Sequence, residues 1–315
     1  MSDNKSAKQG DMEQVGLMPG SRRVQQLAAW SIPIAFAVMG LKAMAWWVTG
    51  SVALLSDALE STVNVIAAIV AFSAIRYSRK PADEDHPFGH YKAEYFAAVM
   101  EGVLIVVAAL LIAREAIDAL FQPALPEAPV LGLAINGIAA IVNALWAGLL
   151  VRAGTAHRSP ALVADGRHIW SDVITSVGVL AGLLLALMTG LAILDPLLAL
   201  VVAANIVYQG WKVISSSVDG LMDRAIATED GERLKEIIAE NADGSLGVHD
   251  LKTRIAGPAT FIDFHLVVPK AMSVGEAHAI CDRLEAAIKA EVPGALTAIH
   301  VEPQGEKAHG VKVQL

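Results

Sequence analysis

Long runs of hydrophobic residues alternate with short polar breaks over the first two thirds of the chain. Each run is close to the roughly 20 residues that an α-helix needs to cross the ~30 Å hydrocarbon core of a bilayer. Two of the breaks are very short, which is typical of tight hairpins between adjacent antiparallel helices. The pattern therefore predicts an all-α transmembrane domain with six spans, at about 27–49, 52–77, 95–121, 129–151, 164–188 and 191–211.

After about residue 212 the pattern changes to that of a small soluble domain. Apolar residues recur at helical spacing in 229–242 and 276–292, alternate as in strands in 249–255 and 261–268, and end with a short strand at 295–302. The order helix–strand–strand–helix–strand predicts a small open α+β sandwich. The chain is thus expected to consist of a mobile N-terminal tail, the six-span domain, the α+β domain and a mobile C-terminal tail, at residues 1–20, 21–212, 213–303 and 304–315.

The composition supports a membrane protein and excludes other classes. Of the 315 residues, 55% are hydrophobic and 18% are charged, whereas globular proteins carry about 25% charged residues. A net charge of −8 and a pI near 5.6 argue against nucleic-acid binding. The single cysteine, Cys281, excludes an intramolecular disulfide. The polar start of the chain predicts no secretory signal peptide.

Lysine and arginine are distributed unevenly between the predicted loops. With six spans, one side of the membrane carries Arg22, Arg23, Arg76, Arg79, Lys80, Lys92, Arg152, Arg158 and Arg167. The opposite loops, including 122–128, carry none. Because positive residues mark the cytoplasmic side, we expect a multi-pass protein of the plasma (inner) membrane with both termini in the cytoplasm.

Ionisable residues inside two of the predicted spans indicate a binding site, because such residues are costly in lipid and usually functional. The second span contains Asp57, Glu60 and Asn64, and the fifth contains His168 and Asp172. Glu60 and Asn64 are four residues apart, as are His168 and Asp172, so each pair lies on one helix face. One imidazole and several oxygens suit Zn²⁺ or a neighbouring first-row metal. The alternative is a structural polar cluster that holds the helices together.

Two further groups of candidate ligands lie outside the predicted spans. The loop after the second span contains Asp83, His86 and His90, which form either a metal site or an acidic loop with incidental histidines. In the α+β domain the candidates are His249, His265, His278, His300 and Glu302. Each of these histidines alone would more often be an ordinary surface or core residue. Four of the nine histidines in so small a domain make metal binding an equally good interpretation.

The chain contains no sequence pattern of a nucleotide-phosphate loop, a dinucleotide fold, a zinc protease or a serine hydrolase. ATP-driven pumping therefore has no support, and uphill transport would draw on an ion gradient. We expect a secondary active transporter rather than an enzyme, with a transported metal and no organic cofactor.

These motifs together resemble those of the cation diffusion facilitator family. The resemblance rests on SVALLSDALESTVN at 51–64, PADEDHPFGHYKAE at 81–94 and HIWSD at 168–172. In the C-terminal part HDLKTR at 249–254, followed by His265, His278 and HVEP at 300–303, is similar to the family's cytoplasmic domain. Collinear similarity covers about residues 27–303. It implies a ferredoxin-like, metallochaperone-like fold for the C-terminal domain.

The resemblance also implies a homodimer that exports divalent metal from the cytoplasm in exchange for protons. The residues that it assigns are Glu60, Asn64, His168 and Asp172 to the transport site; Asp83, His86 and His90 to a loop site; His249, His265, His278, His300 and Glu302 to a cytoplasmic cluster; and Lys92 and Asp223 to a charge pair that interlocks the dimer and its domains.

The transport site departs from the family pattern at two positions. Zinc-exporting members usually have His or Asp in place of Glu60 and Asp in place of Asn64, so this site has one negative charge less. Asp57 is not a standard ligand in the family, and here it is a candidate either to complete the site or to orient Glu60. Zn²⁺ is the first expectation, with Fe²⁺ or Mn²⁺ next and Cd²⁺ as a further substrate. The alternative function is a membrane metal sensor or storage protein that binds metal without translocating it.

Overall fold

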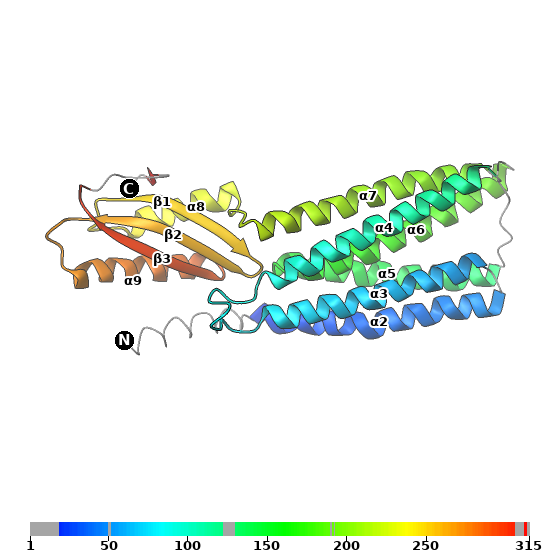
Figure 1. Cartoon of the computed structure of the whole chain (residues 1–315), viewed down its shortest axis with the longest axis horizontal. Helices are drawn as coiled ribbons and strands as arrows, with labels where there is room; N and C mark the ends of the chain where they lie inside the picture. The colour runs from blue at the N-terminus through cyan, green and yellow to red at the C-terminus, as the bar shows by residue number, and fades with distance from the viewer. Residues whose placement is uncertain are drawn as a thin grey trace. The chain divides into compact units, whose positions relative to one another are not determined.

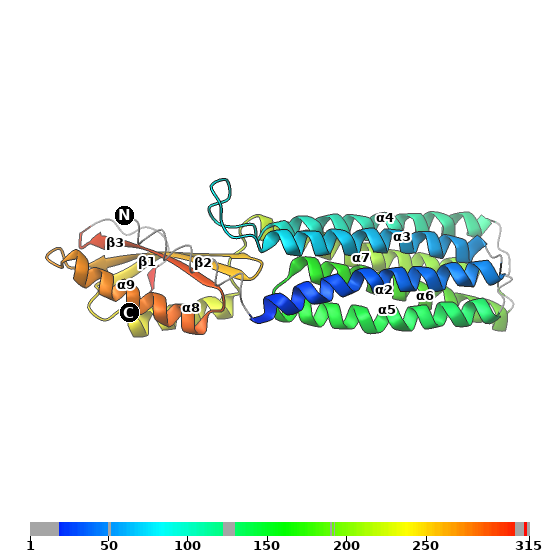
Figure 2. The same ribbon diagram turned by 90° about the horizontal axis from the view of Figure 1, so that it is seen from below.

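The computed structural model describes residues 19–49, 52–121, 130–189, 191, 193–305 and 312–313. Six long helices in this part of the chain form one bundle: α2 (Pro19–Thr49), α3 (Val52–Ser78), α4 (Ala93–Phe121), α5 (Val130–Ala156), α6 (Pro160–Thr189) and α7 (Leu194–Leu221). They run side by side in both views of the chain (Figures 1 and 2). The predicted six-helix domain is confirmed, whereas nearly all of the predicted N-terminal tail lies outside the described residues.

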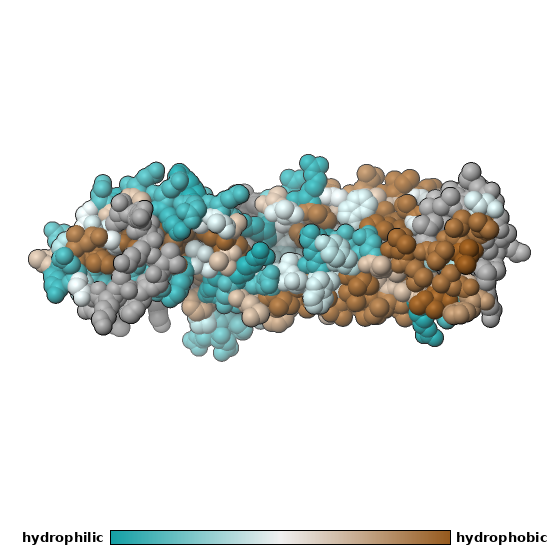
Figure 3. Space-filling model, turned by 90° about the horizontal axis from the view of Figure 1, so that it is seen from above, coloured by the Kyte–Doolittle hydropathy of each residue, from teal (hydrophilic) through white to brown (hydrophobic). Residues whose placement is uncertain are grey.

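The bundle presents apolar side chains outward. Phe96, Leu145 and Trp211 are 65%, 73% and 65% exposed, and hydrophobic residues cover much of the helical unit in Figure 3. Soluble proteins rarely leave large apolar patches in contact with water. Within the described residues, the stretches long and apolar enough to cross a membrane are Arg22–Met44, Ala93–Phe121 and Gly137–Ala156. The helical unit is therefore a membrane domain.

Glycines allow the helices to approach closely around α6. A Cβ added at Gly166 of α6 would lie 2.8 Å from Val151 Cγ2 of α5. Similarly, a Cβ at Gly102 of α4 would lie 3.2 Å from the carbonyl oxygen of Gly210 in α7. Helix α6 also packs against α3 and α4. Helix α6 is thus packed against α3, α4 and α5, and its polar residues His168 and Asp172 are buried.

Helix α7 continues to Leu221, beyond the predicted end of the sixth span at residue 211. Val213, which is 2% exposed, packs against Ala98 of α4 and Ala164 of α6. Tertiary packing thus prolongs the helix after its continuous apolar run has ended. The chain divides into two compact units between Val218 and Asp219, and the segment Pro81–Lys92 belongs to the C-terminal unit. The sequence analysis had placed this boundary at 212/213.

The C-terminal unit is a sheet with helices on one face. Its elements are α8 (Thr228–Asn241), β1 (Gly247–Ala256), β2 (Ala259–Val268), α9 (Val274–Glu291), β3 (Ala295–Pro303) and β4 (Lys312–Val313), with strand order β3-β2-β1-β4. β1 and β2 form an antiparallel hairpin around Gly257, whose φ is 55°. β2 and β3 are parallel and are connected through α9. The predicted α+β domain is confirmed.

Alternation along β2 separates a core face from an open face. Ile262, Phe264 and Leu266 are at most 1% exposed and belong to the core beneath α8 and α9. Because successive strand residues point to opposite faces, Asp263 and His265 lie on the face away from the helices. The histidine cluster described in the next section lies on this open face.

Candidate metal centres

A buried polar chain connects α3 and α6 in the membrane domain. His168 Nε2 lies 2.8 Å from Asn64 Oδ1, and Asn64 Nδ2 donates to Asp172 Oδ2. His168, Asn64 and Asp172 are 3%, 7% and 8% exposed. Asn64 is the central residue, because one amide can offer an acceptor to the imidazole and a donor to the carboxylate. The structure thus brings three of the predicted transport-site residues together.

The remaining candidates for this site, Asp57 and Glu60, belong to α3, but their side chains lie outside the described part of the structure. His168 Nδ1 is buried and has no hydrogen-bond partner among the described residues. A metal-binding imidazole normally donates its second nitrogen to a carboxylate, a carbonyl or a water. His168 Nδ1 can therefore still bind a metal or form a hydrogen bond, since none of the described contacts uses it.

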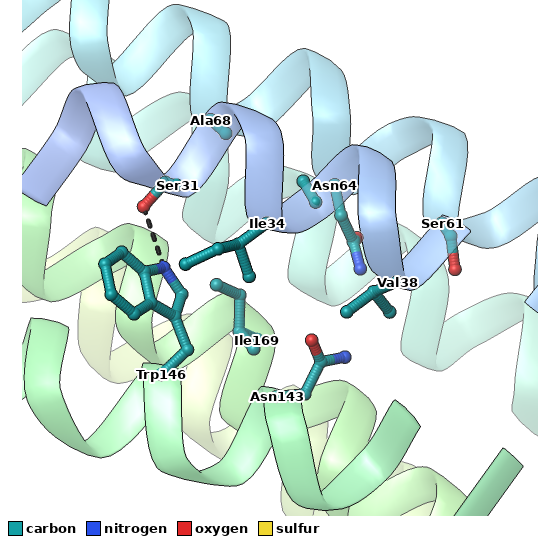
Figure 4. A pocket seen from close by; sticks show the side chains of 10 residues that line it. Ser31, Ile34, Val38, Ser61, Asn64, Ala68, Asn143, Trp146 and Ile169 are labelled. Atoms are coloured by element: carbon teal, nitrogen blue, oxygen red, sulfur yellow. Dashed lines mark hydrogen bonds between the residues drawn. The ribbon is translucent and has the colours of Figure 1, made fainter. Parts of the chain in front are cut away.

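A small cavity borders Asn64 (Figure 4). Its volume is about 10 Å³, and its polar lining comes from Ser31 of α2, Ser61 and Asn64 of α3, and Asn143 and Trp146 of α5. Figure 4 shows Asn64 and Asn143 pointing toward one another across it. A cavity needs about 10–15 Å³ to hold one water molecule. The candidate transport site is therefore bordered by a cavity close to the size of one water, in which a few polar groups interrupt a mostly apolar lining.

The loop between α3 and α4 holds a second group of ligands. Asp83, His86 and His90 each offer a ligand atom within 4.8 Å of the others. Asp83 Oδ1 accepts a hydrogen bond from the His86 backbone N–H at 2.7 Å, and Asp83 Oδ2 lies 3.4 Å from His90 Nε2. The backbone hydrogen bond is the main cause that lowers the pKa of Asp83. An ionised carboxylate between two imidazoles suits a divalent first-row metal.

Ion pairs fasten the end of this loop to the C-terminal unit. Lys92 Nζ lies 2.9 Å from Asp223 Oδ1, and Arg254 Nη1 of β1 lies 3.1 Å from the same oxygen. The hydrogen bond from Lys92 is the main cause that lowers the pKa of Asp223. The guanidinium of Arg254 also lies 5.0 Å from the Phe88 ring and 4.1 Å from the Phe261 ring. The charge pair assigned from the resemblance is thus formed, with Arg254 as a third member.

Three histidines occupy neighbouring positions on the open face of the sheet. His249 of β1 is in register with His265 of β2, which is in register with His300 of β3. Glu302 lies on the same face, and its oxygens are 3.1 Å from His249 Nε2 and 2.9 Å from His265 Nδ1. His300 Nε2 is 3.7 Å from Glu302 Oε1. Strand register therefore assembles imidazoles from three strands around one carboxylate.

Both parts of the chain match models of known protein families. Residues 29–222 match the family model described as the cation efflux transmembrane domain, and residues 226–304 match the model of the cation efflux protein, cytoplasmic domain. The chain belongs to the cation efflux family. The cation diffusion facilitator assignment made from the motifs is confirmed, and the protein is a cation efflux transporter.

Curated relatives of this cation efflux protein match over nearly their whole length. The chain is 41% identical over 283 residues to the uncharacterized transporter sll1263 of Synechocystis, covering 90% of this chain and 91% of the relative. It is 35% identical over 286 residues to the cation-efflux pump FieF of Pectobacterium atrosepticum, covering 90% and 95%. Identity to FieF of Shewanella oneidensis is 34% over 273 residues, covering 87% and 92%.

One acidic residue of the cation efflux protein's cytoplasmic cluster was missed by the sequence analysis. The pairing of β1 with β2 shifts between His249 and Lys252, and Asp250 has a φ of 54° at this bulge. Asp250 Oδ2 lies 3.7 Å from His265 Nε2. Strict alternation would point Asp250 and His249 to opposite faces. The bulge removes this restriction, and the only sequence signal was that Asp250 is adjacent to His249.

His278 does not join the cluster within one chain of the cation efflux protein. It lies on α9, with its side chain 74% exposed and its Nε2 3.6 Å from Asp282 Oδ1. Helix α9 packs through Ile280 and Leu284 against the core face of the sheet. The cluster of His249, His265 and Glu302 lies on the other face. A metal shared with His278 would therefore require a second copy of the chain.

Proposed function

We propose that this cation efflux protein exports divalent metal, with Zn²⁺ as its first substrate, from the cytoplasm in exchange for protons. The observation that carries the proposal is the buried chain His168–Asn64–Asp172 between α3 and α6. It combines an imidazole nitrogen with amide and carboxylate oxygens, a donor set that Zn²⁺ accepts. None of the three residues is more than 8% exposed. A transporter needs ligands inside the bundle, where the metal crosses the membrane. A metal sensor does not require ligands at that position.

Proton exchange follows from the chemistry of these side chains. Only an unprotonated imidazole nitrogen binds a metal, so metal and protons compete for His168. An unperturbed histidine titrates near 6.5, which is within reach of physiological pH differences. Metal binding must also replace the hydrogen bonds through which Asn64 engages His168 and Asp172. A site open to the cytoplasm would load metal, and a site open to a more acidic exterior would exchange it for protons.

The order of substrates follows from the donors. Asn64 supplies a neutral oxygen where an aspartate would supply a charged one, which makes the site less anionic. Affinity for divalent first-row ions nevertheless rises from Mn²⁺ through Fe²⁺ to the later metals, and Zn²⁺ binds more tightly than Mn²⁺. Zn²⁺ is therefore placed first, with Fe²⁺ and Mn²⁺ next and Cd²⁺ as a further substrate.

We further propose a homodimer in the inner membrane with both termini in the cytoplasm. The orientation is supported by the distribution of lysine and arginine between the loops. The dimer is supported by His278, which can approach the cytoplasmic cluster only from another chain, and by His300, whose side chain is 68% exposed beside Glu302. Metal held between two C-terminal units would favour their association.

The test is transport into proteoliposomes that enclose a metal-sensitive dye. Wild-type protein should move Zn²⁺, and the rate should depend on the pH gradient. His168→Ala and Asp172→Ala should reduce uptake to that of empty vesicles, because each removes a buried ligand. His157→Ala, in the segment between α5 and α6, is the matched control and should transport at the wild-type rate. A panel of Zn²⁺, Mn²⁺, Fe²⁺, Co²⁺ and Cd²⁺ ranks the substrates.

Two results would refute the proposal. Wild-type rates in His168→Ala and Asp172→Ala would show that these residues do not form the transport site. Tight metal binding by the wild type without any dye signal would instead identify a metal sensor or storage protein.

A further inference from the structure

The membrane domain buries a carboxyl group that the metal site does not use. Glu101 of α4 is 0% exposed, and neither of its oxygens has a hydrogen-bond partner among the described residues. An ionised carboxylate without a partner in a low-dielectric interior costs several kcal/mol, roughly, even after relaxation. Such a carboxyl group either stays protonated, and thus neutral, or binds a cation during function. We therefore expect Glu101 to bind a proton or another cation.

A second buried carboxyl group lies on α6, the helix that packs against α4 with Ala164 beside Ala98. Asp165 is 1% exposed and is the ionisable neighbour that acts electrostatically on Glu101. Its Oδ2 accepts a hydrogen bond from Ser31 Oγ of α2 at 2.9 Å, and Ser31 Oγ accepts one from Trp146 Nε1 of α5 at 3.0 Å. Asp165 thus belongs to a hydrogen-bond network that draws on α2, α5 and α6, whereas Glu101 of α4 has no hydrogen-bond partner among the described residues.

The charged surroundings of this pair favour a proton over a metal ion. Within the described residues, no lysine, arginine or histidine forms an ion pair with Glu101 or Asp165. No described ionisable side chain of α3 or α7 acts on Glu101. His168, one turn further along α6, interacts with Asn64 and Asp172 instead. The pair offers no imidazole or thiolate, and two neighbouring carboxyl groups without a cation commonly share a proton.

We propose that Glu101 and Asp165 together bind one proton at a site separate from the metal ligands, and that this proton is exchanged during transport. The exchange rests on the antiport proposed above, whereas the binding of the proton does not. The group bound is H⁺ alone. The proton resides on one carboxyl oxygen of the pair and is released to water when the bundle opens.

The cavity beside Asn64 lies between the hydrogen-bond donor of Asp165 and the transport site. One part of its wall is formed by Ser31 and Trp146, whose hydrogen bond is drawn in Figure 4, and another part is formed by Asn64. Ser31 is also the donor to Asp165. A water in this cavity would lie between the hydroxyl that contacts Asp165 and the amide that contacts His168 and Asp172. Such a water would place Asp165 and the metal site in one hydrogen-bonding system.

The first experiment measures the bound proton directly. Infrared difference spectra of the full-length protein in lipid vesicles, recorded as the pH is raised, should contain the carbonyl stretch of a protonated carboxylic acid. Glu101→Gln should remove the intensity that this carboxyl group contributes to the band, because the neutral amide cannot bind the proton. Asp118→Asn is the matched control, since Asp118 is an exposed carboxylate on the same helix, and it should keep the band. An identical band in wild type and Glu101→Gln would overturn the proposal.

The second experiment measures the coupling of that proton to transport. The metal gradient that a given pH gradient can sustain is measured at zero net flux. Each coupled proton multiplies this metal gradient by tenfold per pH unit, since tenfold is about 1.4 kcal/mol. Glu101→Gln should therefore sustain a tenfold smaller metal gradient per pH unit than wild type, while Asp118→Asn should match the wild type. Equal coupling ratios in wild type and Glu101→Gln would overturn the exchange.

The two readouts separate this proposal from the proposed function. Loss of that infrared intensity in Glu101→Gln, in a protein that shows no pH-driven transport, would support the proton-binding pair and overturn the antiport. If a pH gradient drives transport by the wild type and Glu101→Gln leaves the coupling ratio unchanged, the antiport would be supported and the exchange at this pair would be overturned. Asp165→Asn also replaces the carboxylate that accepts from Ser31 with a neutral amide, so Glu101→Gln is the primary variant.

Discussion

Glu302→Gln is the change that tests the cytoplasmic cluster most directly. The side chain of Glu302 is 15% exposed, and its two oxygens lie 3.1 Å and 2.9 Å from ring nitrogens of His249 and His265. Glutamine keeps the length and shape of the side chain and removes the charge. Within the described part of the chain, the remaining acid near these rings is Asp250, whose Oδ2 is 3.7 Å from His265 Nε2. The substitution therefore leaves the imidazoles in place without the anion between them.

The expected loss is large, because the carboxylate contacts two ligand nitrogens at once. The contact with His249 is a hydrogen bond, and hydrogen bonds to charged groups contribute about 1.5–3 kcal/mol. Removal of a residue that only orients a metal ligand already weakens metal binding about 10–100-fold. Glu302 can itself bind the metal, so we expect Zn²⁺ to bind about 100-fold more weakly, a loss of about 2.7 kcal/mol.

Isothermal titration of the fragment from Asp219 to Leu315 with Zn²⁺ measures this difference. The fragment contains the hydrophobic core that packs α8 and α9 against the sheet. Asp263→Asn is the matched control, because Asp263 is an exposed carboxylate on the same open face in β2. It should change the affinity by less than the Glu302 variant does. An unchanged affinity in Glu302→Gln, or an equal loss in Asp263→Asn, would refute the ligand assignment.

Three further predictions concern stability. The ion pairs of Asp223 lower its pKa, so their stabilisation is complete above the ordinary value of about 3.9 and is lost as the pH falls through the lowered value. Asp223 is 48% exposed, so Asp223→Asn should cost at most about 1 kcal/mol near pH 7, and thermal unfolding of the full-length protein should show the difference shrinking below about pH 4. Leu284→Ala removes a side chain that is 0% exposed and should lower the free energy of unfolding of the C-terminal fragment by about 2–5 kcal/mol in denaturant titrations. Gly102→Leu should lower the unfolding temperature of the membrane domain in detergent, because a Cβ there meets the Gly210 carbonyl oxygen at 3.2 Å, whereas Gly137→Ala, with nothing within 4 Å, should not.

Most of the architecture follows from local periodicity. Apolar runs of membrane-spanning length predict the helices of the bundle, and alternation in 249–255 and 261–268 predicts the strands that form the β1–β2 hairpin. The ends of the elements depend on neighbours that the local pattern does not contain. Helix α7 extends to Leu221 because Val213 is buried against two other helices. Helix α9 begins at Val274, ahead of the predicted 276, because Ser273 and Glu276 form a capping box.

The candidate sites divide in the same way. Spacing alone places His168 and Asp172 on one face of a helix, and the short loop segment places Asp83 close to His86 and His90. That Asn64 bridges His168 and Asp172 depends on how α3 packs against α6.

Long-range packing decided the rest. His249, His265 and Glu302 meet because β1, β2 and β3 pair in a particular register, and Asp250 approaches them because β1 contains a bulge. Glu101 and Asp165 carry no motif and are 64 residues apart in the sequence (165 minus 101). Their proximity is a property of the packed bundle. Periodicity specifies which face of an element is polar, but the partner of that face is set by packing across the whole domain.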